Sequence, residues 1–181
     1  MAFDSFVTIR SAVPADAERL REIYAYYVIN TAVSFEYEVP TAAEFCRRIE
    51  HTLERYPYLV LEKDNVIAGY AYAGVFKDRE AYDRSCEVSI YLAPDQRRQG
   101  FGRALYAALE AKLRAQGILN LYACIGDPIV EDEYLTKDSE RFHQRLGYTK
   151  VGEIHRCGYK FGRWYNMIWM EKIIGDHPVR K

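Results

Sequence analysis

Two glycines stand where an alternating apolar segment passes into a long amphipathic one. The stretch reads IYLAPDQRRQGFGRALYAALEAKL from Ile90 to Leu113, with Gly100 and Gly102 at the change of pattern. Because glycine lacks a Cβ, the backbone there can adopt unusual φ values and approach a ligand closely. The first N–H groups of a helix have no intrahelical partner and lie at the positive end of its dipole. The pattern predicts an anion site suited to phosphate, although an ordinary tightly packed helix start would give the same short motif.

The residues around the two glycines narrow the kind of phosphate ligand. A dinucleotide-binding turn would need a small residue three positions after Gly102, where Leu105 stands. No Gly-x4-Gly-Lys-Ser/Thr pattern occurs in the chain, which excludes a P-loop. The spacing Arg97-x-x-Gly100-x-Gly102, after a strand and before a helix, instead resembles the pyrophosphate loop of the GNAT acetyltransferases.

The resemblance extends over nearly the whole chain, from Ile9 to about Ile173. The segments TAVSFEYEVPT, REAYDRSCEVSIYLAP, SERFHQRLGYTKVGE and GYKFGRWYNMIWME are similar to consecutive signatures of the phosphinothricin (methionine sulfoximine) N-acetyltransferase subgroup. This resemblance implies the GNAT fold, acetyl-CoA as co-substrate, a small amino-acid-like amine as acceptor, and a homodimer. The subgroup commonly has Asn, contacting the cofactor arm, where this chain has Thr136. The resemblance also implies the cofactor-binding residues, which are Tyr91, Leu92, Arg97, Arg98, Gln99, Gly100, Phe101, Gly102, Arg103 and Ser139.

Acetyl transfer to an amine needs a neutral amine, a stabilised oxyanion and a proton for the leaving thiolate. Glu87 is the expected base. It lies on the strand CEVSIYL, on the same face as Ser89 and Tyr91. It also matches the catalytic glutamate of the family. The sequence pattern alone would equally fit a solvated carboxylate. We expect it to act through water, in direct transfer within a ternary complex without a cysteine nucleophile. The freed strand end before Pro94 is expected to supply the oxyanion donor.

His143 is the candidate proton donor for the thiolate. It lies four residues before Gly147, where many GNAT enzymes carry a tyrosine general acid, and a histidine with a pKa near neutrality could serve there. A structural role is equally compatible with a lone helical histidine. Tyr148, at the start of the next strand, is expected to be core, and the four cysteines are expected to be small buried or half-buried side chains.

Recognition of the acceptor rests on family positions. Arg79 could bind an α-carboxylate, and Tyr82 and Phe35 match other positions near the substrate; loop solvation or packing is the alternative for each. Tyr70 and Tyr72 share a strand face and could line a pocket, although half-buried sheet surface is the commoner meaning.

Periodicity predicts the elements that position these residues. We expect strands at 6–12, 58–76 (two strands around Asp64-Asn65), 86–92 and 119–125, and a closing pair at 148–160 and 164–173. Helices are expected at 14–28, at 41–55 with a Thr41/Glu44 capping box, at 100–116 and at 138–147. Strands and helices mix without strict alternation. The prediction is one α/β (α+β) domain over residues 1–181, with a mixed, mostly antiparallel sheet of about six to seven strands and helices on both faces.

Bulk composition narrows the function further. The chain has 181 residues, 28% charged residues and a formal net charge of −1, so no basic field suggests nucleic acid or an anionic membrane as partner. The sequence shows no pattern typical of a signal peptide or a membrane-spanning segment, so we expect a cytoplasmic protein. The cysteines and histidines lack the spacing of metal ligands, so no bound metal is expected. Two other functions stay open: acetylation of peptide or protein N-termini, and a non-catalytic acyl-CoA sensor.

Overall fold

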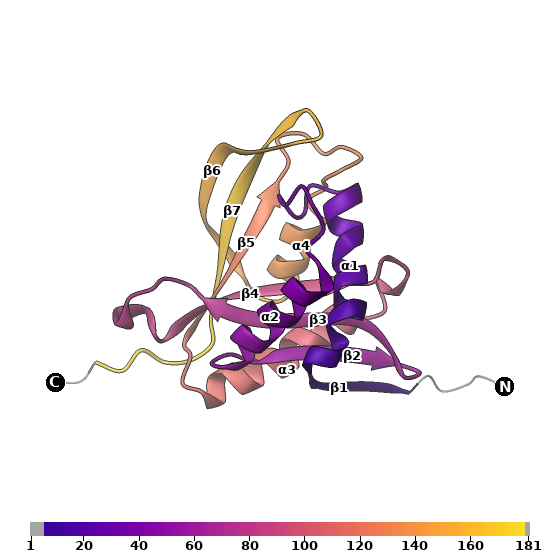
Figure 1. The fold of residues 1–181 in the computed structure, drawn as a ribbon. Coiled ribbons are helices and arrows are strands. Elements are labelled where there is room, and N and C mark those ends of the chain that lie inside the picture. The colour runs from indigo at the N-terminus through magenta and orange to yellow at the C-terminus, as the bar shows by residue number, and fades with distance from the viewer. Residues whose placement is uncertain (1–5, 180–181) are drawn as a thin grey trace.

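The computed structural model describes residues 6–179, and all of its strands join one sheet (Figure 1). The sheet order is β1-β2-β3-β4-β5-β7-β6. The strands are β1 (Val7–Ser11), β2 (Tyr58–Lys63), β3 (Val66–Val75), β4 (Ser85–Leu92), β5 (Asn120–Asp127), β6 (Thr149–Lys160) and β7 (Arg163–Ile173). The α-helices are α1 (Ala17–Asn30), α2 (Ala42–Leu53), α3 (Phe101–Ala115) and α4 (Asp138–Arg145), with 3-10 turns at Pro14–Asp16, Glu80–Tyr82 and Pro94–Gln96.

The sheet consists of two antiparallel halves joined by a short parallel contact. Strands β1 to β4 pair antiparallel, and so do β5, β7 and β6. Between the halves, β4 and β5 pair only from Ser85↔Asn120 to Glu87↔Tyr122. Beyond that pair the two strands separate, and Figure 1 shows β5, β6 and β7 rising away from β1 to β4. The parallel joint therefore opens a wedge in the middle of the sheet.

Helices cover both faces of the sheet, as the sequence predicts. Side chains alternate along β4, and Cys86, Val88, Ile90 and Leu92 pack with α3 and α4. Tyr91 points to the opposite face, where it packs with the buried sides of α1 and α2. The predicted mixed, largely antiparallel sheet with helices on both faces is confirmed.

Two local expectations need correction. Thr41 accepts a hydrogen bond from the Glu44 N–H (3.1 Å), but the Glu44 carboxylate pairs with Arg47 and Arg48, so only half of the capping box forms. The expectation that all four cysteines are buried or half-buried is wrong for Cys124 and Cys157, which are exposed. Cys124 lies on β5 beyond the last β4 pair, so it has a strand neighbour on the β7 side alone. Cys157 lies in an irregular stretch of β6.

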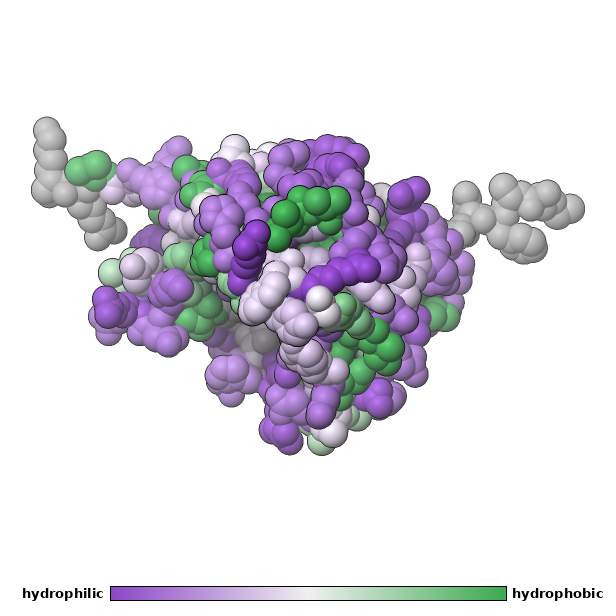
Figure 2. Space-filling view, turned by 90° about the horizontal axis from the view of Figure 1, so that it is seen from above, coloured by the Kyte–Doolittle hydropathy of each residue, from purple (hydrophilic) through white to green (hydrophobic). Residues whose placement is uncertain are grey.

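The surface at the end where the β6/β7 hairpin lies is mainly hydrophilic, with separate hydrophobic patches (Figure 2). Within residues 6–179, no helix is long and apolar enough to cross a bilayer. The same residues contain no group of three or more His, Cys, Asp or Glu side chains arranged to hold a metal ion.

Candidate functional site

The wedge between β4 and β5 exposes backbone groups of β4. The Ala73 N–H bonds the Pro57 carbonyl on the β2 side, so the backbone groups of Tyr70 and Tyr72 face β4 and pair with those of Tyr91 and Ser89. By alternation, the N–H and C=O of Ile90 face β5, where pairing has already stopped. An interior strand thus presents an unpaired hydrogen-bonding edge.

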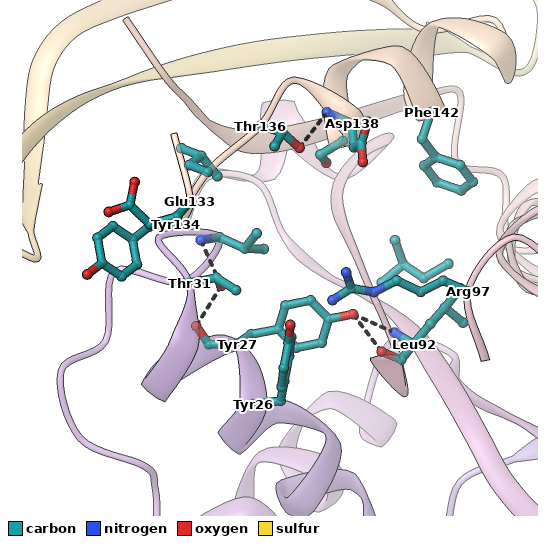
Figure 3. A pocket seen from close by; sticks show the side chains of 14 residues that line it. Tyr26, Tyr27, Thr31, Leu92, Arg97, Glu133, Tyr134, Thr136, Asp138 and Phe142 are labelled. Atoms are coloured by element: carbon teal, nitrogen blue, oxygen red, sulfur yellow. Dashed lines mark hydrogen bonds between the residues drawn. The ribbon is translucent and has the colours of Figure 1, made fainter. Parts of the chain in front are cut away.

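The end of that edge is closed by a tyrosine of α1. Tyr27 Oη donates to the Leu92 carbonyl (2.6 Å) and lies 3.3 Å from the Leu92 N–H, as the dashed lines in Figure 3 show. Tyr27 therefore satisfies the last residue of β4. Ile90, one step further into the wedge, keeps its N–H available for a ligand.

Two connected cavities fill the wedge. The outer cavity has a volume of about 340 Å³ and lies between α1, the end of β4, α4 and the 133–136 segment (Figure 3). The inner cavity, of about 60 Å³, reaches between β4 and β5. Val33, Ile90, Leu135 and Ser139 line both. A long, narrow ligand can therefore enter along α1 and α4 and end at the diverging strands.

The glycine turn lies at the outer side of this channel. Gly100 is the N-cap of α3 with φ +83°, a left-handed conformation that side chains disfavour. Gly102 has a different role, because a Cβ there would come within 3.0 Å of the Phe142 ring of α4. The first intrahelical bond is Ala104 N–H to Gly100 C=O (3.1 Å), which leaves the N–H groups of the first turn free of intrahelical partners. The predicted anion-binding helix start has the required geometry.

The ten expected cofactor-binding residues divide between the channel and the exposed turn. Leu92, Arg97 and Ser139 line the outer cavity, and Tyr91 and Ser139 line the inner one. The Arg97 guanidinium lies 5.4 Å and 5.2 Å from the ring centroids of Tyr26 and Tyr27, so it forms a wall of the channel. The turn and first helical residues Arg98, Gln99, Gly100, Phe101, Gly102 and Arg103 line neither cavity. Gln99 accepts a hydrogen bond from Lys63 (3.0 Å).

Glu87 is the last residue of β4 that pairs with β5, so its carboxylate lies where the wedge begins. It is half-buried, and burial raises its pKa above the ordinary value of 4.5 while Lys77 opposes the rise. Glu87 lines none of the described cavities, but the next residue, Val88, lines the inner one. A carboxylate with a raised pKa beside that cavity is suited to accept a proton.

The expectation of a near-neutral pKa for His143 is wrong. The side chain is 3% exposed, and burial lowers its pKa from 6.5 to about 4. Nδ1 lies 2.8 Å from the Ser139 carbonyl, which only accepts, so Nδ1 carries the hydrogen. In the neutral ring Nε2 then accepts from Tyr106 Oη at 3.0 Å. His143 is therefore an acceptor at neutral pH, and the hydroxyl that lines the inner cavity beside it belongs to Tyr106.

The three expected acceptor-binding residues line none of the described cavities. Phe35 is half-buried; its ring lies where a Cβ on Gly158 would be, and it packs against Tyr165. Arg79 and Tyr82 are exposed in the β3–β4 connection, close in sequence to Glu87. Packing is the observed role of Phe35 in the single chain.

Sequence reasoning missed Tyr27, Tyr106 and Lys160. Tyr27 and Tyr106 stand at apolar positions of helical stripes, so their hydroxyls gave no signal. Lys160 is 3% exposed, and its ammonium donates to the carbonyls of Val28, Thr31 and Ser34 at 2.8, 2.9 and 2.6 Å. It ties the loop after α1, which carries Phe35, to the β6/β7 hairpin. Its place in the KFGRW segment was the available signal.

Comparison with known proteins agrees with this architecture. Residues 9–169 match the family described as "Acetyltransferase (GNAT) domain". The chain is 37% identical to a phosphinothricin N-acetyltransferase of Streptomyces viridochromogenes, over 96% of this chain and 92% of the relative. It is 31% identical to an L-methionine sulfoximine/L-methionine sulfone acetyltransferase of Salmonella typhimurium, over 96% and 98%.

A crystal structure of a GNAT superfamily phosphinothricin acetyltransferase from Sinorhizobium meliloti, in complex with AcCoA, superposes with a TM-score of 0.84. The two chains are 33% identical, with 93% of this chain and 89% of that chain covered. The open wedge, the glycine turn and these matches agree: the chain belongs to the GNAT family of acetyltransferases.

Proposed function

We propose that the protein moves an acetyl group from acetyl-CoA to the primary amine of a small amino-acid-like acceptor, by direct transfer in a ternary complex. The observation that carries the proposal is the channel that begins beside the free N-terminus of α3 and reaches Val88, the neighbour of Glu87, where β4 and β5 diverge. The names of the relatives support acceptors of the phosphinothricin, methionine sulfoximine or methionine sulfone type.

The residues along the channel fit coenzyme A. The free N–H groups at the start of α3, with the exposed Arg98 and Arg103, suit a pyrophosphate. The extended cavity beside Ile90 suits a pantetheine arm, which can pair with the unpaired edge of β4 as a strand would. Thr136 lines this cavity, but its Oγ1 accepts a hydrogen bond from the Asp138 N–H (3.3 Å).

Two groups of β4 serve the attack on the thioester. Glu87 removes a proton from the acceptor ammonium through water, which leaves the neutral nitrogen free to attack the thioester carbon. The Ile90 N–H donates to the oxygen that becomes negative in the tetrahedral intermediate. The Leu92 N–H is the less suitable donor, because Tyr27 Oη already lies beside it.

Departure of the thiolate involves Tyr106 and His143. Burial raises the pKa of Tyr106, so its hydroxyl keeps its proton. In the free protein this single hydrogen is donated to His143 Nε2, and it turns toward the sulfur when the thiolate forms. His143 holds this hydroxyl at the inner cavity and acts as a positioning residue. We assign Phe35, Arg79 and Tyr82 to acceptor recognition in the homodimer that the family resemblance implies. Sedimentation equilibrium tests the homodimer.

The test is thiol release from acetyl-CoA with methionine sulfoximine, methionine sulfone or phosphinothricin as acceptor, comparing wild type with Glu87→Gln. The variant should keep acetyl-CoA binding and lose turnover by about a hundredfold or more, because it removes the base. Glu153→Gln on the exposed strand β6 is the matched control and should keep its rate.

Equal rates in Glu87→Gln and wild type would contradict the role of Glu87. Acetyl-CoA binding without thiol release for any acceptor would indicate a sensor. Release only with a peptide bearing a free N-terminus would indicate an N-terminal acetyltransferase.

A further inference from the structure

A third cavity lies on the sheet face that carries Glu87, between the sheet and α2. Its volume is about 240 Å³, and we call it the tyrosine pocket, after its wall of Tyr24, Tyr58, Tyr70, Tyr72 and Tyr91, with Glu36 from the loop after α1. The rings of Tyr58 and Tyr72 are stacked at 4.8 Å, and those of Tyr58 and Tyr70 at 5.7 Å. The pocket is therefore a preformed aromatic cavity.

Two buried polar atoms of this wall have no hydrogen-bond partner among the described residues. They are Tyr70 Oη, in a side chain that is 1% exposed, and Glu36 Oε2. By contrast, Tyr24 Oη is bonded to Ser34 Oγ at 2.7 Å. A buried polar atom without a partner is costly, so a molecule that supplies partners to both of these atoms is stabilised in the pocket. The two free atoms indicate that the pocket receives a ligand with complementary groups.

The chemistry of the two atoms defines those groups. Tyr70 Oη carries a proton, because burial raises the pKa of this residue, and so it can donate to an acceptor atom. The Glu36 carboxylate, whose other oxygen pairs with Arg48, requires an N–H or O–H donor for Oε2. The matching end group contains an acceptor and a donor close together.

The charge of the wall disfavours an anionic end group. Arg48 is the guanidinium that lines the pocket, and it already pairs with Glu36 Oε1 (3.0 Å) and Glu44 Oε1 (3.2 Å). Two carboxylates thus neutralise the Arg48 cation, and His51, the other basic side chain of the wall, lies beside the Glu54 carboxylate (3.4 Å). An incoming anion would lie against the free oxygen of Glu36.

The pocket is within reach of the transfer site. Glu87, Ser89 and Tyr91 project from the same face of β4, about 7 Å apart from one to the next. Tyr72 is the cross-strand partner of Ser89, and Tyr70 is the partner of Tyr91. Tyr72 is thus the wall residue nearest to Glu87 along the strands. An acceptor whose amine lies beside Glu87 can extend its side chain along this face, past Tyr72, into the tyrosine pocket.

We propose that the tyrosine pocket is the side-chain subsite of the acceptor and selects an uncharged end group that accepts from Tyr70 and donates to Glu36. A sulfoximine, with one oxygen and one N–H on the same sulfur, has this pair, and so does a carboxamide; a phosphinate has only anionic oxygens. This inference rests on the proposed function, and it names methionine sulfoximine over phosphinothricin as the class of acceptor.

The experiment compares kcat/KM for methionine sulfoximine and phosphinothricin in wild type, Tyr70→Phe and Glu36→Gln. Wild type should prefer methionine sulfoximine by at least about tenfold. Tyr70→Phe should raise KM for methionine sulfoximine about tenfold, the usual effect of one lost hydrogen bond in a buried site, with little change for acetyl-CoA. Glu36→Gln should reduce the preference by improving the use of phosphinothricin.

Tyr148→Phe is the matched control, because Tyr148 Oη is also buried without a partner but belongs to the core on the α3 face. It should leave KM for both acceptors unchanged. If Tyr70→Phe behaves like Tyr148→Phe, the hydroxyl meets only water, and the inference is overturned. A wild-type preference for phosphinothricin would overturn it as well.

A binding measurement separates this inference from the proposed function. Methionine sulfoximine is titrated calorimetrically into wild type and Tyr70→Phe, each saturated with coenzyme A. Weaker binding to the variant supports the subsite even if no acetyl transfer is detected. Absent or equal binding contradicts it.

Discussion

Burial of His143 should make the stability of the protein depend on pH in the range where a histidine of the unfolded chain titrates. In the folded protein its pKa is lowered from 6.5 to about 4, because the neutral ring is enclosed between Ser139 and Tyr106. Between pH 4 and pH 6.5, His143 is mostly protonated in the unfolded chain and mostly neutral in the folded protein. The free energy of unfolding therefore rises with pH there, and it falls as the solution is acidified from 6.5 toward 4.

The size of the effect is set by the two pKa values. Relative to pH 7.5, His143 should cost about 2 kcal/mol of stability at pH 5 and about 3 kcal/mol near pH 4. Glu87 acts in the opposite direction, since its raised pKa favours the folded protein on acidification. The contribution of His143 is therefore measured as a difference between wild type and His143→Gln.

Urea unfolding at pH 7.5, 6 and 5 provides the measurement. Wild type should lose about 2 kcal/mol more than His143→Gln between pH 7.5 and pH 5. The absolute stability of the variant is immaterial, because only the slopes are compared. His155→Gln is the control, since that side chain is 75% exposed, and it should titrate in parallel with wild type. Parallel curves for wild type and His143→Gln would refute the buried, neutral histidine.

Three further outcomes are expected. In a pH profile of kcat/KM, the apparent pKa of the acid limb should lie above the ordinary carboxyl value of 4.5, because burial raises the pKa of Glu87 and the base must be ionised. An apparent pKa at or below 4.5 would contradict this. Gly102→Ala should raise KM for acetyl-CoA severalfold, because its Cβ, 3.0 Å from the Phe142 ring, forces that ring to move; steady-state kinetics will show whether KM changes. Lys160→Met should lower the free energy of unfolding by about 3 kcal/mol, since three carbonyls lose a charged donor, whereas Lys150→Met on the exposed face of β6 should cost less than about 1 kcal/mol.

The fold could be predicted from the sequence because its signals are local. Alternation in CEVSIYL identified the two faces of β4, and the helix after Gly100 begins where the glycine turn indicates. Periodicity does not specify which strands pair. The short parallel joint of β4 and β5, which creates the site, is a long-range property that the sequence analysis did not predict.

The candidate site was predictable to a lesser degree, because burial decides the chemistry of its side chains. His143 has an ordinary sequence context, and only the enclosing structure shows that it is a neutral acceptor. Tyr106 was hidden within an apolar stripe, since a tyrosine there is indistinguishable from core until its hydroxyl finds a partner. For Tyr70 the commoner interpretation as half-buried sheet surface was incorrect, since it is almost fully buried and lines a cavity.

The parallel joint also determines how the molecule responds to mechanical load. Among the described strands, β1 pairs with β2 through five residue pairs and β5 with β7 through eight, whereas the backbone pairing between the two halves of the sheet is confined to the segment from Ser85 to Glu87. A force that pulls β1 and β6 apart should therefore act mainly on this short parallel joint, because the pairing within each half of the sheet is more extensive. A ligand bound between β4 and β5 would contact both halves of the sheet. Occupancy of the channel should therefore raise the force needed to separate β4 from β5.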